Sequence, residues 1–288
     1  MTLTPIKVGA LDRKLISGDH PLTEDSLTSL PAAKKLWAGF RHRYGMQEAA
    51  VPMLTWPSHQ PKTGKNKTPT YLLHLSPADV SGHYNTCMWA TPGCRAACLN
   101  TAGRGKTNTV IEGRRLKTLM FGGDPNSFLA LLQHEIDLAV KRHDEPVAIR
   151  LNGTSDIRWE LVAPWWFDRW GSHVIFYYYT KSPNRNPPNN YHLTYSINER
   201  DSFEQVKVKM ERYSRAAMVF DTGKGQPLPA FWGGIEVQDG DLDDQRWDNW
   251  YPIIVGLRAK GDGIGDTSGF VHCGVESQRP ENIVWRSL

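Results

Sequence analysis

The sequence is poor in cysteine, in long apolar runs and in excess charge of either sign. Four cysteines in 288 residues are too few for a disulfide-rich scaffold. No apolar run approaches the roughly 18–20 residues of a membrane-spanning helix, and the first residues lack the continuous hydrophobic segment of a signal peptide. A net charge of +4 is too small to indicate nucleic-acid binding by itself. We therefore expect a globular cytoplasmic protein without membrane association.

The few cysteines are concentrated in one segment. Cys87, Cys94 and Cys98 fall within twelve positions of each other, and Cys273 stands near the other end of the chain. In a reducing compartment, such a group indicates a metal or redox site rather than disulfides. The neighbouring residues are glycine, proline and arginine instead of an apolar stripe, which argues against three buried structural thiols. The segment therefore predicts a metal centre.

The spacing C-x6-C-x3-C matches neither a standard zinc finger nor the ferredoxin patterns. The three cysteines follow the first predicted strand, which is also the place of the cluster loop in radical-SAM enzymes, although the C-x3-C-x2-C spacing of those enzymes is absent. A four-iron cluster and, as the alternative, a zinc ion would each accept these three thiolates and a fourth ligand. Cys273 is the candidate for that ligand, followed by His272 or His83. If Cys273 is not a ligand, the open coordination position favours catalysis.

From residue 71 onward, short apolar runs alternate with helical patterns. The runs predict strands within 71–77, 146–156, 173–182, 191–198, 215–221 and 252–261, and helices near 109–120, 126–142, 163–171 and 202–213. This alternation predicts an α/β fold with a parallel sheet, and its best match is a (β/α) barrel, incomplete or irregular. The alternative is an open doubly wound sheet. We expect residues 1–70 to form an irregular N-terminal extension with one helix near 32–44, packed on a barrel-like domain at 71–288 that carries the cysteines.

Sites in parallel α/β folds form at the carboxyl ends of the strands. The residues that follow the predicted strands include candidates for acid–base catalysis, namely Asp156, Glu199, Asp221 and Lys181. The strand ends and the cysteine segment also supply candidates for binding a phosphate-bearing substrate, namely Arg95, Arg104, Lys106, Asn152, Asn198, Arg258 and Lys260.

A basic stretch surrounds the cysteines. Residues 60–118 contain nine Lys or Arg and two acids, a balance that attracts phosphate groups. Within it, Arg95 and Arg104 are expected to lower the pKa of the neighbouring thiols. Lys106 opens a predicted helix, where backbone amides bind anions, but Asn100 stands where a Walker motif needs glycine, so nucleotide hydrolysis is not expected. The acidic segment QDGDLDDQRWD lacks the closing glutamate of an EF-hand and predicts a solvated turn that docks on the basic stretch.

Three segments together resemble a phage-borne family, the one named after gene product eighty-eight of an actinobacteriophage. They are YNTCMWATPGCRAACLNTAGRG, RLNGTSDIRWE and IIVGLRAKGDGIGDTSGFVHC, and the resemblance covers roughly residues 71 to 273. It implies a phage or prophage origin, a place in the cytoplasm of the bacterial host, and action on nucleic acid or its precursors. It brings no established reaction, so no catalytic role is carried over.

These observations predict a phage iron–sulfur protein that acts on DNA, RNA or a nucleotide. Its cluster would be held by Cys87, Cys94, Cys98 and Cys273, and as an enzyme it would modify a base or a sugar. The alternative is a non-catalytic phage protein in which zinc folds the cysteine loop and the basic stretch binds DNA or a host protein. A cluster protein is coloured, whereas a zinc protein is not.

Overall fold

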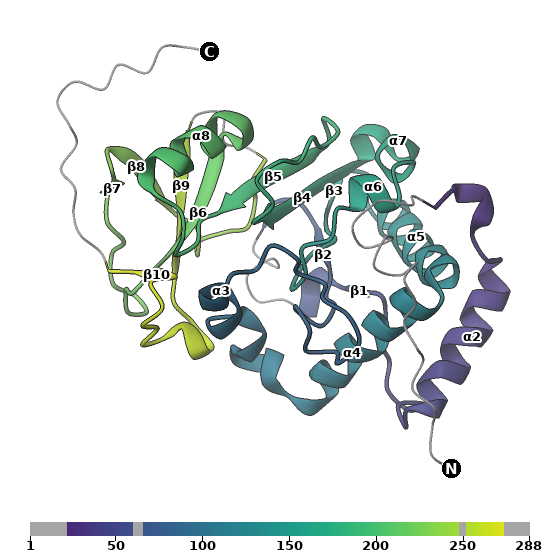
Figure 1. The fold of residues 1–288 in the computed structure, drawn as a ribbon. Coiled ribbons are helices and arrows are strands. Elements are labelled where there is room, and N and C mark those ends of the chain that lie inside the picture. Colours follow the sequence, from purple (N-terminus) through teal and green to yellow (C-terminus); the bar gives the residue numbers. More distant parts are fainter. Residues whose placement is uncertain (1–21, 60–65, 248–251, 274–288) are drawn as a thin grey trace.

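The computed structural model describes residues 22–59, 66–247 and 252–273, which form a mixed α/β fold around one sheet (Figure 1). Its ten strands are β1 (Leu54–Thr55), β2 (Thr70–Leu73), β3 (Val147–Arg150), β4 (Val174–Thr180), β5 (Tyr191–Ser196), β6 (Arg215–Phe220), β7 (Phe231–Trp232), β8 (Ile235–Asp239), β9 (Ile253–Arg258) and β10 (Val271–His272). Its α-helices are α2 (Leu30–Arg43), α3 (Pro92–Ala96), α4 (Asn108–Gly123), α5 (Pro125–Arg142), α6 (Trp159–Val162), α7 (Trp166–Arg169) and α8 (Phe203–Tyr213). Short 3-10 turns complete the connections.

The strands lie in the order β1-β2-β3-β4-β5-β6-β9-β8-β7, with β10 paired to β6 beside this path. From β2 to β8 all neighbours are parallel, and only the edge strands β1 and β7 pair antiparallel. The α/β prediction with a mostly parallel sheet is therefore confirmed. The path ends at β1 and β7, so the sheet formed by the described residues is open. Strands β2 to β6 follow one another in chain order, without the reversal that a doubly wound sheet contains.

Every strand predicted from an apolar run is present, as β2, β3, β4, β5, β6 and β9. The strands that the sequence did not reveal are β1, β7, β8 and β10. Three of these have only two residues, too few for any alternation pattern. β1 pairs with β2 although it lies inside the predicted N-terminal extension, so part of that extension belongs to the sheet.

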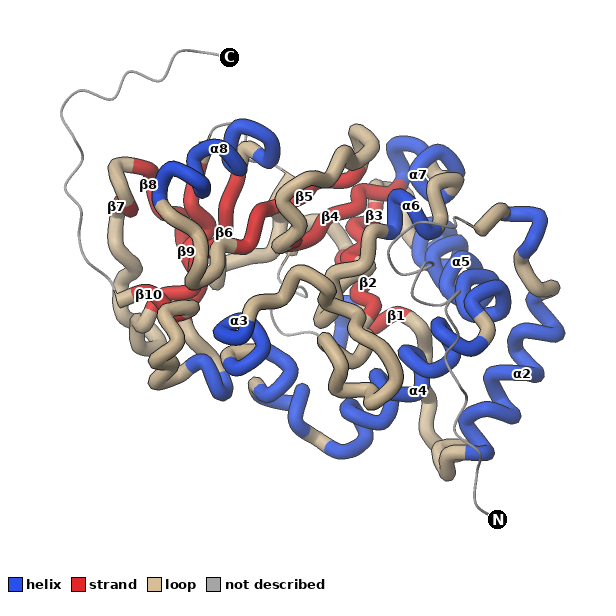
Figure 2. Tube along the Cα trace, viewed as in Figure 1, coloured by secondary structure: helices blue, strands red, loops and turns tan. Residues whose placement is uncertain are grey.

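The helices divide into two groups (Figures 1 and 2). α2, α4 and α5 pack together at the β1–β3 end of the sheet, and α8 packs on β5 and β6. Local sequence determines where α5 begins, because the Asp124 carboxylate accepts a hydrogen bond from the Ser127 amide at 3.0 Å and Pro125 occupies the first turn. Phe128 and Ile136 lie on the buried stripe of the helix and are fully buried. Side chains of this size each stabilise the fold by about 1.5–3 kcal/mol.

β6 extends beyond the end of β5. The carboxyl end of β5 pairs with the first half of β6, with Tyr195 opposite Ala216, whereas the second half of β6 pairs with β10, with Val271 opposite Val219. The last described strand thus pairs with the part of β6 that β5 does not reach. This places the late segment of the chain at the same edge of the sheet as the loops that follow the parallel strands.

The late segment also contacts the cysteine loop. The turn at Gly261–Gly263 packs on the turn at Leu99–Thr101, and the Asp262 amide donates a hydrogen bond to Thr101 Oγ1 at 3.2 Å. A Cβ on Gly261 would lie 2.7 Å from that oxygen and 3.0 Å from the backbone of Ala102, and Gly261 has a φ of +57°. Both observations explain why glycine stands at this contact.

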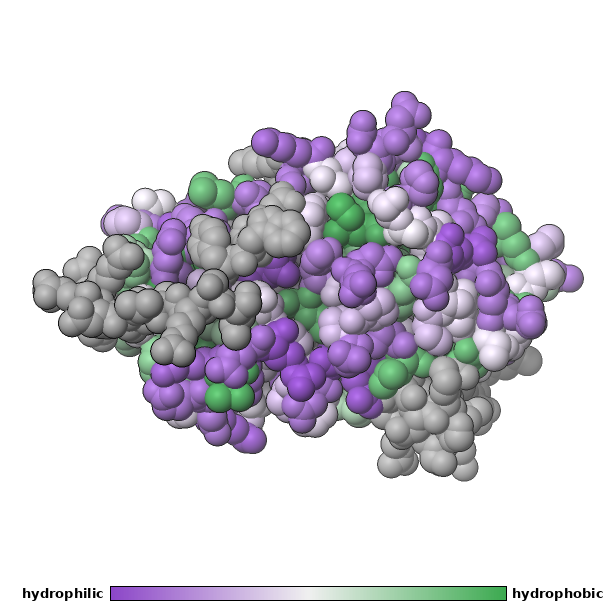
Figure 3. Space-filling view, turned by 90° about the horizontal axis from the view of Figure 1, so that it is seen from above, coloured by the Kyte–Doolittle hydropathy of each residue, from purple (hydrophilic) through white to green (hydrophobic). Residues whose placement is uncertain are grey.

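The surface seen from above is mainly hydrophilic, with small separate apolar patches where atoms are coloured (Figure 3). No helix within the described ranges has the length and apolar character needed to cross a membrane.

Candidate functional site

A cavity of about 350 Å³ lies at the carboxyl ends of the parallel strands. Small-molecule sites typically have volumes of about 300–1,000 Å³, so this volume suits one small ligand. Many of the residues predicted from the sequence line the cavity, namely Cys87, Cys94, Cys98, Asn152, Asp156, Lys181, Arg258 and Lys260. They come from segments that are up to 173 positions apart in the chain, as Cys87 and Lys260 are. The sheet topology therefore brings them together.

Other predicted residues do not line the cavity, namely Glu199, Asn198, Asp221, Arg95, Arg104, Lys106 and Cys273, nor do His83 and His272. Arg104, Lys106 and Asp221 are exposed to solvent. Arg95 is also exposed and forms an ion pair with Asp79 at 3.0 Å. Cys273 is exposed directly after β10.

Cys87 lies between the loops that follow β2 and β3. Its Sγ accepts a hydrogen bond from the Ala78 amide at 3.3 Å and donates to the Thr154 carbonyl at 3.7 Å. The Cys87 amide donates to the Asn85 side chain at 2.8 Å. These contacts fix the first cysteine to the sheet edge, with the sulfur at the cavity wall.

Cys94 and Cys98 are positioned by the short helix α3. Thr91 caps this helix, because its Oγ1 accepts from the Cys94 amide at 3.3 Å. Glu199, from the loop after β5, holds the cap in turn, since its carboxylate accepts from Thr91 Oγ1 at 2.6 Å and from the Gly93 amide at 2.9 Å. Burial raises the pKa of Glu199, but these hydrogen bonds outweigh it and the net shift is downward. Glu199 thus stays ionised and orients the helix that carries the thiols.

The three thiols of the cavity are weakly acidic without a metal. Burial raises the pKa of Cys87 to about 12, and it also raises the pKa values of Cys94 and Cys98. The prediction that Arg95 and Arg104 lower these pKa values is wrong, because both guanidinium groups face solvent. The cations that favour the thiolates are Lys181, near Cys94 and Cys98, and Arg114, near Cys98.

This burial predicts the order in which the cysteines of the metal-free protein react. At pH 8, iodoacetamide is expected to modify exposed Cys273 at least about 100-fold faster than Cys87, because alkylation requires the thiolate and its fraction falls about tenfold for each unit by which a pKa exceeds the pH. Peptide mapping by mass spectrometry over time measures the rates. The urea-unfolded protein, in which all four cysteines should react alike, is the control. Equal rates for Cys87 and Cys273 in the folded protein would contradict the burial of Cys87.

Asp156 is fully engaged at the bottom of the site. Its carboxylate accepts from Thr180 Oγ1 and from the Lys181 amide, both at 2.9 Å, and lies 3.5 Å from the Arg185 guanidinium. Burial nevertheless raises the pKa of Asp156. These contacts hold the end of β4 in place. Asp156 also lines the cavity.

Lys181 presents its ammonium group at the same wall. Nζ donates to Ser196 Oγ at 2.8 Å and to the carbonyls of Ser196 and Ile197 at 3.2 and 3.3 Å, and it lies 4.7 Å from the centre of the Phe270 ring. Three acceptors match the three N–H donors of an ammonium group. Burial lowers the pKa of Lys181, and the neighbouring Cys94 and Asp156 oppose that shift. The arrangement places a positive charge beside the thiols.

The two predicted asparagines organise loops. Asn152 Oδ1 accepts from Ser155 Oγ at 2.8 Å and from Trp159 Nε1 at 3.0 Å, which shapes the loop after β3. Asn198 donates to Asp201 at 2.7 Å and lies outside the cavity lining. Substrate binding was predicted from an asparagine that follows a strand. Such an asparagine is equally typical of a residue that forms hydrogen bonds with the backbone of its own loop.

Arg258 and Lys260 lie at the cavity wall with acidic partners. The Arg258 guanidinium forms two hydrogen bonds with Asp239, both at 2.9 Å, and one with Asp241 at 3.2 Å. Lys260 Nζ donates to Asp241 at 2.6 Å. The carboxylates of Asp239 and Asp241 therefore pair with these two late cations. The acidic segment also contacts the start of the basic stretch, because the Lys67 amide donates to Gln245 at 2.8 Å and the Asp244 amide donates to Asn66 at 3.1 Å.

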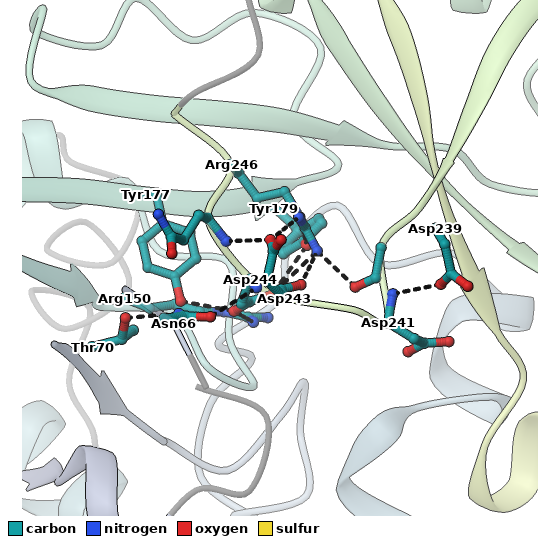
Figure 4. Close-up of polar contacts among 12 residues, drawn as sticks. Asn66, Thr70, Arg150, Tyr177, Tyr179, Asp239, Asp241, Asp243, Asp244 and Arg246 are labelled. Atoms are coloured by element: carbon teal, nitrogen blue, oxygen red, sulfur yellow. Dashed lines mark hydrogen bonds and ion pairs between the residues drawn. The ribbon is translucent and has the colours of Figure 1, made fainter. Parts of the chain in front are cut away.

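Figure 4 shows the polar network that sequence reasoning missed. Asp244, predicted to be part of a solvated turn, is 1 % exposed. It accepts hydrogen bonds from Arg150 at 3.0 Å, Tyr177 at 2.7 Å and Tyr179 at 3.3 Å. The sequence contained one usable signal, because residues two apart on a strand share a face, which places both tyrosines on one side of β4. Arg246 completes the network through Tyr179 at 2.6 Å.

Within the part of the chain that the structure describes, no three His, Cys, Asp or Glu side chains converge in a way that could hold a single metal ion. The three cysteines of the cavity are nevertheless close enough to influence each other electrostatically, since Cys98 raises the pKa values of Cys87 and Cys94, after the larger effect of burial.

Comparison with known proteins identifies one family. The family model described as Gene product 88 matches residues 54–274, from β1 to directly after the last described residue. No curated protein and no solved structure matches the chain.

Proposed function

The chain belongs to the phage family described as Gene product 88, and on this premise we propose that it is an iron–sulfur protein that modifies a nucleotide or nucleic acid. In this proposal it works in the cytoplasm of the bacterial host, where cysteines stay reduced. Cys87, Cys94 and Cys98 hold a four-iron cluster, and the remaining cavity receives a phosphate-bearing substrate.

One observation carries the proposal, namely that the three clustered cysteines line the same cavity as Lys181, Arg258 and Lys260. Buried structural cysteines normally behave as small apolar residues and pack among other apolar side chains, so three thiols that line a cavity together with charged groups are unusual for a purely structural role. Thiols beside a ligand-sized space at the carboxyl edge of a parallel sheet stand where such folds perform chemistry.

We favour a cluster over a single ion, because a cluster does not require its ligands to converge on one point. A zinc ion requires its ligands to converge on one point, and the described residues contain no such group. A four-iron cluster takes one thiolate at each iron, so its ligands surround a space instead. Deprotonation of three buried thiols also requires compensating charge, which the irons and Lys181 supply together.

The proposal assigns distinct tasks to the residues around the cavity. A bound cluster supplies electron-transfer chemistry. Glu199 orients α3 and so the thiols of Cys94 and Cys98. Lys181 holds a positive charge beside them, and the apolar side chains of Leu257 and Phe270 keep water from the wall. The order of β2 to β6 supports the further proposal that the fold is an incomplete (β/α) barrel with its site at the usual edge.

Anaerobic purification of the wild-type protein tests the proposal. An absorption band at roughly 400 nm, together with iron and acid-labile sulfide, is the expected result. Cys94→Ser should lose most of the iron. Cys273→Ser is the matched variant, since Cys273 is exposed and outside the cavity lining. Retention of the cluster in Cys273→Ser favours a catalytic role, because one coordination position then remains for a ligand other than cysteine, whereas its loss identifies Cys273 as the fourth ligand.

Two outcomes would contradict the proposal. Colourless protein with one zinc ion, lost in Cys94→Ser, would favour the non-catalytic, zinc-stabilised protein that binds DNA or a host protein. Such binding would weaken steeply as salt is raised. Protein that contains neither iron nor zinc after anaerobic purification would exclude a metal role for the cysteines.

A further inference from the structure

The chain places one of its own carboxylates in an anion-binding arrangement at the cavity wall. Asp241 Oδ1 accepts a hydrogen bond from Lys260 Nζ at 2.6 Å. Its Oδ2 accepts from the backbone amide of Arg258 at 3.1 Å and from Arg258 Nη1 at 3.2 Å. An ammonium group, a backbone amide and a guanidinium group around two oxygens are the donors that bind phosphate in many proteins. All three residues line the cavity.

The turn that carries Asp241 is anchored on both sides, and Figure 4 shows the anchor around Asp244. Before it, Asp239 forms two hydrogen bonds with Arg258, both at 2.9 Å. After it, Asp244 is buried in the network with Arg150 and Tyr177. Leu242, between the two anchors, is 71 % exposed and constrains little. Neither anchor uses the Asp241 side chain, although Arg258 contacts both Asp239 and Asp241, so the turn keeps these anchors when the Asp241 side chain leaves its partners.

We propose that Asp241 occupies the position of a substrate phosphate and that the substrate is a small phosphomonoester of nucleotide size, which displaces it. This inference rests on the proposed function and specifies its substrate. A monoester carries a charge of about −1.5 to −2 at pH 7, whereas a carboxylate or an internal phosphodiester carries −1. A monoester thus competes with Asp241 by charge, and a diester within a nucleic-acid strand does not. The cavity of about 350 Å³, part of which the proposed cluster would fill, limits the ligand to nucleotide size or smaller.

The exposure of Lys260 agrees with exchange of partners, whereas the Arg258 side chain is only 12 % exposed. The Lys260 side chain is 49 % exposed, and an ion pair at this exposure contributes only about 0–1 kcal/mol to stability. The Lys260–Asp241 contact therefore does little to stabilise the fold, but together with the Arg258 contact it keeps two cations close to each other at the cavity wall. A ligand with more negative charge than a carboxylate can therefore pair with both Lys260 and Arg258.

Calorimetric titration with each of the four common ribonucleoside 5′-monophosphates, and with the methyl ester of each, tests the inference. In the wild type, at least one monophosphate should bind about tenfold more tightly than its methyl ester. Asp241→Asn should bind that monophosphate about tenfold more tightly than the wild type does, because the competing charge is gone. Asp243→Asn is the matched control, since Asp243 lies in the same turn, is exposed and pairs with Arg246 at 3.2 Å; it should bind like the wild type.

Equal or weaker binding by Asp241→Asn would overturn the inference, as would equal binding of monoester and methyl ester by the wild type. If Asp241→Asn does not fold in a thermal melt, the ester comparison decides, together with Lys260→Met, which should weaken monophosphate binding about tenfold. Iron and sulfide are measured on the same samples. Tighter binding by Asp241→Asn without a cluster supports the phosphate site and contradicts the proposed function, and a cluster without the binding change does the reverse.

Discussion

Replacing Asp244 with alanine is expected to lower the free energy of unfolding by about 3–5 kcal/mol. Asp244 is 1 % exposed, and its carboxylate faces the Arg150 guanidinium at 3.0 Å and the Tyr177 hydroxyl at 2.7 Å. The substitution leaves Arg150, whose side chain is only 16 % exposed, without its nearest opposite charge. A lone buried charge costs far more than the loss of an exposed ion pair.

Urea denaturation followed by circular dichroism measures this effect. Asp243→Ala is the matched control, because Asp243 is the adjacent acid of the same turn and its side chain is 51 % exposed; it should change the free energy of unfolding by less than about 1 kcal/mol. If the two variants are equally stable, Asp244 is not buried as the structure places it. A large loss with Asp244→Ala alone would show that the acidic segment contains a core residue.

Replacing Arg185 with leucine is expected to have an effect of similar size, about 3–5 kcal/mol. Arg185 is 2 % exposed. Its Nε donates to Glu160 at 2.8 Å, a second nitrogen contacts the other oxygen of that carboxylate, and Asp156 lies 3.5 Å from the guanidinium. Leucine fills part of the space but leaves the buried Glu160 carboxylate without its guanidinium partner, and leaves Asp156 with Lys181 as its neighbouring cation. Because Asp156 lines the cavity, the site should loosen along with the fold.

The matched control for this variant is Arg169→Leu. Arg169 also contacts two carboxylates, those of Glu24 and Asp137, but its side chain is 33 % exposed. That substitution should cost no more than about 1 kcal/mol. Chemical denaturation of both variants gives the comparison, and similar losses for the two would refute the distinction between a buried and a surface network. Double substitution of Arg185 and Glu160 to apolar residues should recover part of the loss, since it removes the unpaired charge.

Local sequence patterns determined the elements of this protein. The parallel strands β2 to β6 and β9 were visible as apolar runs, as in HVIFYYYTKS for β4, because a strand buried on both faces has to be apolar throughout. The parallel strand β8, of which only Ile235 is buried, was not visible in this way. The start of α5 was visible in Asp124 and Pro125, since capping depends on residues within one turn. The cysteine cluster was visible because its members are close in the chain, and the rule on strand ends placed them beside Lys181 and Arg258 correctly.

Only the tertiary structure decided the electrical environment of the site. Two adjacent aspartates of one turn differ in burial, with Asp243 exposed and Asp244 buried, because burial depends on segments far away in the sequence. The pKa values of the thiols rise through the desolvation of a folded interior, which the local arginines Arg95 and Arg104 do not reach. A strand of two residues, such as β10, forms only by pairing with a longer strand, in this case β6. Sequence fixes what is local, whereas charge, burial and edge pairing depend on contacts that form only when the whole chain has folded.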